Sequence, residues 1–193
     1  MHLISTAKEK QKALQILVYA YLEAANVTWM LKSKSSEKLH AIFLLLFHEA
    51  QAKEGAYLSE DQKSVLFLYD QQIKANSLAQ ALRKLYVFLF VTGISKGMKA
   101  LKFQKIVAGI RPKEGLLGMA LATAEKPMTT ATVFELKHTV VQIATEKKLP
   151  IYAETTVPRL KSLYEAIGFK MYHEMPHPYA PLTVWFLKRE LTK

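Results

Sequence analysis

Residues 149–169, LPIYAETTVPRLKSLYEAIGF, contain the patterns of a strand, a helix and a helix stop in one short stretch. Apolar residues alternate with other residues over 149–154, which is the period of a strand. Over 157–167 they recur at three- and four-residue spacing, which predicts a helix with one apolar face. This strand–helix unit is the part of the chain from which the fold can be worked out in both directions.

The boundaries of the predicted helix are marked by residues with specific roles. Thr155 and Thr156 are good candidates for the cap at its start, because a hydroxyl oxygen accepts a hydrogen bond from a free backbone N–H group. Pro158 suits the first helical turn, which needs no N–H donor. Gly168 is placed to end the helix in the left-handed conformation, and Phe169 begins the next apolar run.

Similar patterns predict strands and helices on both sides of this stretch. The predicted strands cover 2–4, 56–59, 65–69, 116–122, 149–154, 169–175 and 182–187. The predicted helices cover 6–25, a segment that begins near 36, 78–90, 130–147 and 157–167. Residues 26–34 interrupt the pattern and are predicted to be a break between helices. The run 116–122 is apolar almost throughout, which is typical of a strand buried on both faces.

Residues 77–110 are predicted to form a helix–loop–helix insertion, because Gly93 and Gly97 interrupt an otherwise helical pattern. Lysines alternate with apolar residues over 96–105. One interpretation of this segment is a basic patch that contacts RNA, and the other is a lysine face exposed to solvent. The order of elements elsewhere predicts one domain over 1–193.

The composition restricts the chemistry. Half of the 193 residues are hydrophobic and 22% are charged, so the chain is long enough to bury a sizeable core. The absence of cysteine excludes disulfides, thiolate zinc sites and a cysteine nucleophile. The histidines lack a convincing third ligand, so no metal site is expected. The net charge of +11 favours acidic partners, although the lysines are dispersed along the chain.

Membrane and nucleic-acid partners are not expected from the sequence. The apolar runs 39–47 and 85–91 fall short of the ~20 residues that a membrane span needs. The first residues lack the pattern of a signal peptide. The expected location is therefore the cytoplasm, with no membrane partner and with nucleic acid unlikely.

Residues 163–169, L-Y-E-x-x-G-F, resemble a motif of the GNAT superfamily, the Gcn5-related N-acetyltransferases. The resemblance is close over 149–169 and loose over 115–190, and before residue 110 it is limited to the order of elements. Val157 stands where the family motif has asparagine. The resemblance implies an α/β (α+β) fold with a mixed, mostly antiparallel central sheet, a splayed parallel pair of strands, and flanking helices.

The resemblance also implies a reaction: transfer of an acetyl group from acetyl-CoA to a small-molecule or peptide amine. Tyr164 matches the general acid of the family, and a phenol with a pKa near ~10 stays protonated and can donate to the departing thiolate. The resemblance does not identify the general base. Glu154, at the end of a strand beside the expected cleft, is one candidate and Glu174 a weaker one; the other interpretation of Glu154 is an ordinary polar strand-end residue.

The residues that would contact acetyl-CoA follow from the same resemblance. Met119, Ala120 and Leu121 lie where the family has a bulged strand whose backbone N–H polarises the thioester carbonyl. Val157 and Leu160 lie where the family contacts the pantetheine arm. The acetyl-CoA-dependent enzyme is expected to be a monomer or a homodimer.

The pyrophosphate loop of the family reads R/Q-x-x-G-x-G/A, and two registers fit here. Lys126, Thr129 and Ala131 can take the three motif positions, or Pro127, Thr130 and Thr132 can. The first register keeps a basic residue and the final alanine, and Thr130 lies inside it. The loop contains no glycine. An alternative function is therefore a GNAT-fold protein without turnover that binds a ligand or a partner, and a third is a basic RNA-associated domain.

Overall fold

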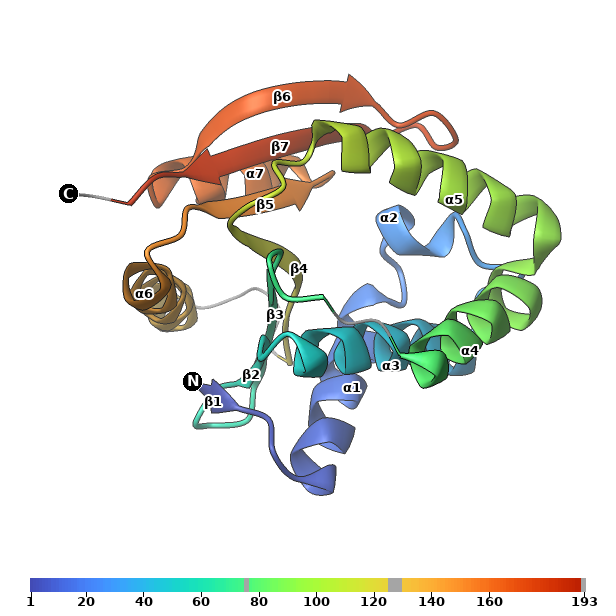
Figure 1. Ribbon diagram of the computed structural model, residues 1–193, viewed down its shortest axis with the longest axis horizontal. Coiled ribbons are helices and arrows are strands. Elements are labelled where there is room, and N and C mark those ends of the chain that lie inside the picture. The colour runs from blue at the N-terminus through green and yellow to red at the C-terminus, as the bar shows by residue number, and fades with distance from the viewer. Residues whose placement is uncertain (75–76, 125–129, 192–193) are drawn as a thin grey trace.

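A computed structural model describes residues 1–74, 77–124 and 130–191 of the chain. Its strands form a seven-stranded sheet in the order β1-β2-β3-β4-β5-β7-β6 (Figure 1). Neighbouring strands are antiparallel except for β4 and β5, which are parallel. The strands are β1 His2–Leu3, β2 Ala56–Leu58, β3 Ser64–Asp70, β4 Leu116–Thr123, β5 Ile151–Thr155, β6 Lys170–Pro176 and β7 Thr183–Arg189.

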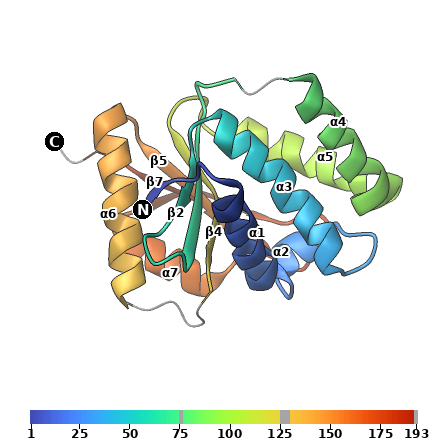
Figure 2. The ribbon, with the colours of Figure 1, turned by 90° about the horizontal axis from the view of Figure 1, so that it is seen from below.

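Helices cover both faces of this sheet. Figure 2 shows α6 on one side of the strands and α1 and α3 on the other. The helices are α1 Ala7–Tyr21, α2 Ala25–Thr28, α3 Ser36–Ala52, α4 Leu78–Tyr86, the π-helix η1 Val87–Thr92, α5 Gly93–Ile110, α6 Thr130–Lys147 and α7 Pro158–Ala166. The sequence therefore predicted the order of the main elements, and the bounds of α6 agree with the predicted 130–147.

Two large apolar clusters, one on each face of the sheet, form most of the core, and a smaller third cluster contains Val107, Val184 and Phe186. The first contains Phe43 and Phe47 of α3 and Phe67 of β3, each at most 2% exposed. The second contains Leu116 of β4 and Leu187 of β7, together with Leu136 of α6. The alternation of side chains along each strand supplies both clusters from the same backbone.

Residues 77–110 differ from the predicted helix–loop–helix. The helical run continues through η1, and the break is the backbone of Gly93, whose φ is +72°. Gly97 lies inside α5 and is buried. A Cβ at this position would stand only 2.7 Å from the ring of Phe88. This glycine therefore serves close packing of α5 against η1, and the prediction that it interrupts the helix was wrong. A second difference is α2, a single turn within the predicted break.

The start of α7 also differs from the prediction, whereas its end agrees with it. The cap position is Val157, which makes no side-chain capping bond. Thr155 instead accepts a hydrogen bond from the Val157 N–H at its Oγ1, 3.1 Å away. Gly168 has φ +97°, and the Phe169 N–H donates to the Tyr164 carbonyl at 3.0 Å. This six-to-one bond is the expected glycine-dependent stop.

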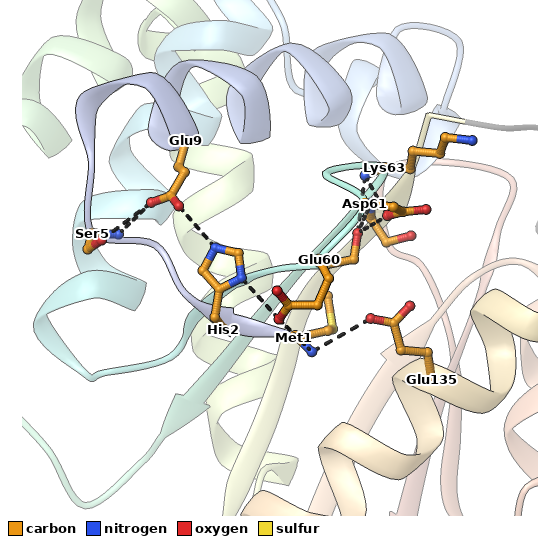
Figure 3. Close-up of polar contacts among 10 residues, drawn as sticks. Met1, His2, Ser5, Glu9, Glu60, Asp61, Lys63 and Glu135 are labelled. Atoms are coloured by element: carbon orange, nitrogen blue, oxygen red, sulfur yellow. Dashed lines mark hydrogen bonds and ion pairs between the residues drawn. The ribbon is translucent and has the colours of Figure 1, made fainter.

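The first turn of α1 is fixed by a group of polar side chains (Figure 3). The Glu9 carboxylate accepts hydrogen bonds from the backbone N–H groups of Ser5 and Thr6, each at 3.0 Å. His2 lies between two carboxylates, 3.0 Å from Glu9 and 3.3 Å from Glu60. The backbone donors, followed by His2, lower the pKa of Glu9 to about 2. The α1 start is therefore tied to the β2–β3 turn.

The helical segment Leu78–Ile110, with its break at Gly93, is 33 residues long and is apolar enough, by length and composition alone, to cross a membrane. Only 17% of its most apolar window is buried inside the protein. Figure 1 shows that the run is bent, with α4 and α5 forming two limbs at the margin of the molecule.

Candidate active site at the splayed strands

The parallel strands β4 and β5 are paired over only part of their length. Their register runs from Leu116 opposite Ile151 to Gly118 opposite Ala153 and then stops. Both strands continue past this point, β4 to Thr123 and β5 to Thr155. On the edge of β4 that faces β5, the ladder between the two strands therefore ends at Gly118.

A bulge in β4 marks the point where the strands separate. In the pairing with β3, Leu68 lies opposite Gly118 while Phe67 lies opposite Ala120, so Met119 is an extra residue. A bulge re-aims the backbone that follows it. Met119, Ala120 and Leu121, the residues assigned from the sequence to the thioester, thus begin at the bulge itself.

The orientation of Leu121 shows the effect of the bulge. Before it, the Leu116 N–H donates towards β5, to the Pro150 carbonyl at 2.9 Å. After it, the carbonyl of the odd-numbered Leu121 accepts a hydrogen bond from the Tyr21 hydroxyl at 3.1 Å instead of from β3. Since the N–H and C=O of one strand residue point to the same edge, the Leu121 N–H also faces away from β3. The splay thus presents a backbone donor.

Tyr21 is the last residue of α1. Its ring packs 5.1 Å from that of Phe43, as a core residue would, while its hydroxyl reaches β4. Burial raises the pKa of the Tyr21 phenol. The apolar spacing of α1 located the side chain, but no local pattern indicates a hydroxyl partner 100 residues away.

Tyr164 projects from α7 into the second apolar cluster, next to Phe169 with 5.3 Å between ring centroids. Leu121 packs against the same cluster, and Tyr21, whose hydroxyl donates to the Leu121 carbonyl, is close enough to Tyr164 to act on its phenol. Burial raises the pKa of Tyr164, and the neighbouring Tyr21 phenol adds to the shift. Tyr164 is therefore protonated at neutral pH, which is the state a proton donor requires.

Glu154 forms a two-pronged ion pair with Arg111, the residue that follows α5. Arg111 Nη2 donates to Glu154 Oε2 at 2.7 Å, and Arg111 Nε donates to Glu154 Oε1. Both side chains are less than one-fifth exposed. This geometry fixes the carboxylate and joins the end of the 77–110 segment to β5. The sequence did not indicate Arg111.

Glu154 and Tyr164 lie on opposite faces of β5. Ala153 packs in the same cluster as Tyr164, whereas Tyr152 packs in the other cluster, with Tyr21. Glu154 alternates with Ala153 and so shares the face of Tyr152. Burial, followed by the charge of Glu154, raises the pKa of Tyr172 to about 12.

Glu174, the weaker candidate for the base, accepts a hydrogen bond at 3.0 Å from the ring N–H of Trp185, a residue of β7.

The remaining residues assigned to acetyl-CoA are placed unevenly. Lys126 and Thr129 lie outside the described residues. Thr130 and Ala131 open α6, an 18-residue helix that starts a few residues after the end of β4. Val157 is 40% exposed at the start of α7, and the Leu160 N–H donates to its carbonyl at 3.0 Å. Two helix N-termini thus follow the two splayed strands, and such ends favour anions.

Other features lie away from this region. A cavity of about 670 Å³ is bounded by β1, Tyr57 and residues 134–146 of α6. Within residues 1–74, 77–124 and 130–191, no three His, Cys, Asp or Glu side chains gather as a metal site requires.

Comparisons with known proteins identify the fold. No protein-family model matches the chain. Nor does any curated protein. Among solved structures, the C-terminal condensation domain of Ebony, determined with β-alanyl-dopamine, has a TM-score of 0.71 at 14% identity, with 96% of each chain covered. A structure described as histone acetyltransferase HPA2 and related acetyltransferase, from Corynebacterium glutamicum, has a TM-score of 0.66 at 16% identity, covering 98% of this chain and 94% of that one.

A third structure extends the likeness to enzymes named for small amines. The putative arylalkylamine N-acetyltransferase 7 from the yellow fever mosquito, Aedes aegypt, has a TM-score of 0.58 at 10% identity, covering 97% and 86% of the two chains. At these identities the likeness establishes the fold alone. The chain has a GNAT-like fold along nearly its whole length, as predicted: a mixed sheet with one parallel pair and flanking helices.

Proposed function

We propose that this chain is an N-acetyltransferase that moves an acetyl group from acetyl-CoA to an amine. The observation that carries the proposal is the splay of β4 and β5 at the Met119 bulge, with Tyr164 on the helix that follows β5. Structural neighbours with the same fold are named as N-acetyltransferases, which supports the reaction class.

The proposed reaction needs one group that gives a proton to the leaving thiolate and one that takes a proton from the amine. The amine nitrogen forms a bond to the thioester carbon, and the backbone N–H groups of 119–121 stabilise the charge on the carbonyl oxygen. The C–S bond then breaks, and Tyr164 gives its proton to the thiolate. The ammonium proton leaves towards Glu154, directly or through water.

The acyl donor would be held at the helix starts. Lys126 and residues 129–131 would bind the pyrophosphate at the N-terminus of α6, and Val157 and Leu160 would contact the pantetheine arm. The +11 charge of the chain favours this polyanionic donor. The acceptor we propose is a small-molecule or peptide amine.

The wider assignments remain part of the same proposal. We place residues 1–193 in one domain with a helical insertion at 77–110, acting in the cytoplasm as a monomer or a homodimer. The Arg111–Glu154 pair supports treating the insertion as part of the site, because it connects the two directly.

Calorimetric titration with acetyl-CoA is the test of donor binding, with desulfo-analogue and free CoA as comparisons. We expect saturable binding, followed by CoA release when a panel of arylalkylamines, polyamines and peptide amines is added. Absence of binding at high micromolar acetyl-CoA would reject the proposal that this chain is an acetyl-CoA-dependent enzyme.

A second candidate is a GNAT-fold protein that binds a ligand or partner without turnover. The glycine-free sequence 126–132 and Val157 in place of asparagine favour it, since a Cβ restricts the backbone at a phosphate loop. Binding of acetyl-CoA with no CoA release across the whole amine panel would select this candidate.

A further inference from the structure

The exposed surface of α4, η1 and α5 is unusually apolar. Of the sixteen large apolar side chains that are exposed in the described part of the chain, ten lie between Leu78 and Ile106. They recur at helical spacing along each limb. We call the following set the apolar arm face: Leu82, Leu85, Phe90, Ile94, Met98 and Leu101, which are 45–67% exposed.

The charge of the same segment has one sign. Residues 77–110 contain six basic residues and neither aspartate nor glutamate, although the whole chain has 16 acidic residues. Lys99, Lys102 and Lys105 are exposed on α5, and Lys84 is exposed on α4, two helices that carry parts of the apolar arm face. Long basic side chains can keep their charge at a polar boundary while their methylene stems lie along apolar surface.

We propose that the apolar arm face is a docking surface for an anionic lipid membrane, on which α4 and α5 lie without crossing it. Exposed Leu, Ile, Met and Phe supply burial in the interfacial region, and the lysines supply attraction to acidic headgroups. The expectation of no membrane partner rested on span length, which does not bear on a surface-lying helix.

The geometry of the arm excludes a spanning mode. The limb before Gly93 consists of the 9 residues of α4 and the 6 of η1, about 22 Å at ~1.5 Å per residue, and is too short for the ~30 Å hydrocarbon core. α5 carries Lys96, Lys99, Lys102 and Lys105, nearly one lysine per turn, which a lipid-spanning helix does not tolerate. Both limbs therefore suit the membrane boundary.

A groove next to the arm fits the same partner. It has a volume of about 270 Å³ and lies between α3 and α4, and its lining includes Leu44, Leu82, Tyr86 and Arg83. An apolar depression beside a guanidinium combines the features needed for an acyl chain and the phosphate above it.

Other partners fit the face less well. Two copies of the chain would bring like charges together, because no acidic residue of 77–110 is available to pair with the lysines. Nucleic-acid interfaces are polar and wet, whereas this face exposes aliphatic side chains.

Vesicle co-sedimentation of the full chain tests the proposal without any acyl donor. Vesicles of phosphatidylcholine alone would be compared with vesicles containing 30% phosphatidylserine. We expect binding to the anionic vesicles that weakens as salt is raised. Equal binding to both vesicle types, or binding to neither, overturns the proposal.

Paired variants assign the binding to the face. Lys102→Gln with Lys105→Gln should lower the partition coefficient about thirtyfold, from the contribution of each lysine near an acidic surface. Lys8→Gln with Lys12→Gln, the same charge change on exposed positions of α1, should leave it within about twofold. Equal losses from both pairs would indicate non-specific attraction and reject the docking face.

The apolar contribution has its own matched pair. Phe90→Ser should reduce binding, whereas Phe134→Ser on α6, with nearly the same exposure (64% against 63%), should not. Sedimentation velocity without vesicles distinguishes a self-association surface: a dimer that Phe90→Ser dissociates, in a chain that does not bind vesicles, would replace the membrane with a second copy. Binding to duplex DNA or an acidic protein in place of vesicles would also reject the lipid partner.

Discussion

The two candidate proton-transfer residues, Tyr164 of α7 and Glu154 of β5, lie on opposite sides of β5 in contrasting environments. On one face, Tyr164 lies among apolar side chains that keep its phenol uncharged. On the other, the Glu154 carboxylate is held by two donors of Arg111. The difference teaches that the two sides of one short strand provide different environments, apolar for Tyr164 and polar for Glu154, because alternate residues of the strand meet different layers of the fold.

The neutral face gives the largest predicted effect. Tyr164→Phe keeps the ring beside Phe169 but removes the proton donor, so kcat should fall about thousandfold with little change in acetyl-CoA affinity. Because burial raises the pKa of Tyr164, the wild type should show no alkaline loss of activity from this phenol below about pH 10. Steady-state kinetics and titration calorimetry measure both. Tyr172→Phe is the control, and equal losses in the two variants would remove Tyr164 as the acid.

The ion pair between Arg111 and Glu154 can be removed by a substitution of either residue. Glu154→Gln and Arg111→Gln each destroy the same ion pair, and each should lower the free energy of unfolding by about 2 kcal/mol, since the pair is mostly buried. If Glu154 accepts the amine proton, only Glu154→Gln should also lower kcat, by about a hundredfold. Urea unfolding and kinetics on both variants decide this.

A surface ion pair serves as reference for that result. Lys161 and Glu165 are 2.9 Å apart on α7 and more exposed, so Lys161→Gln should cost about 0.5 kcal/mol or less. Equal kinetic losses in Glu154→Gln and Arg111→Gln would assign Glu154 to structure alone.

The bond between Tyr21 and Leu121 links the two faces and should give a smaller effect. Tyr21→Phe removes one hydrogen bond to a strand carbonyl and should cost about 1 kcal/mol of unfolding free energy. Tyr86→Phe, at an exposed tyrosine, should cost less. Thermal unfolding of the two variants gives the comparison, and indistinguishable values would mean that this bond does not stabilise the splay.

The smallest effect concerns a carboxylate that is held by backbone donors instead of a cation. The pKa of Glu9 is lowered from its ordinary 4.5 to about 2, so its stabilising contribution is complete above about pH 4.5 and is lost as the pH falls towards 2. Glu9→Gln should therefore lower Tm at pH 7, and its difference from wild type should shrink between pH 5 and pH 2. Gln11→Ala, at an exposed and uncharged position of α1, is the control, and its difference from wild type should be the same at both pH values.

Local chemistry explains which parts of the fold were predictable from sequence. Gly168 ends α7 because its own conformation permits φ +97°, and the apolar period of β5 lies within five residues. The start of α7 was not predictable in the same way. Thr155 and Thr156 were the expected caps, but Val157 takes the cap position, and the Thr155 hydroxyl accepts a hydrogen bond from the Val157 N–H.

The site was predictable only where one residue is sufficient to suggest a role. Tyr164 followed from a motif, whereas Arg111 lies 43 residues from Glu154 and Tyr21 lies 100 residues from Leu121. Neither pairing leaves a periodic signal, because the contacts depend on how whole layers pack. Gly97 shows the same limit: its role in the packing of α5 against Phe88 depends on the π-helical turn that precedes it.

The single extra residue at Met119 acts on the strand as a change of phase. Counting from the start of β4, even-numbered residues point their backbone towards β5; past Met119, it is the odd-numbered Leu121 that points away from β3. Removing Met119 would let Ala120 follow Gly118 directly in an uninterrupted ladder with β3, so β4 would lose the irregularity at the point where its pairing with β5 stops. The opening between β4 and β5 thus depends on the number of residues in β4. Insertions and deletions in this strand should therefore change the opening more than substitutions of its side chains.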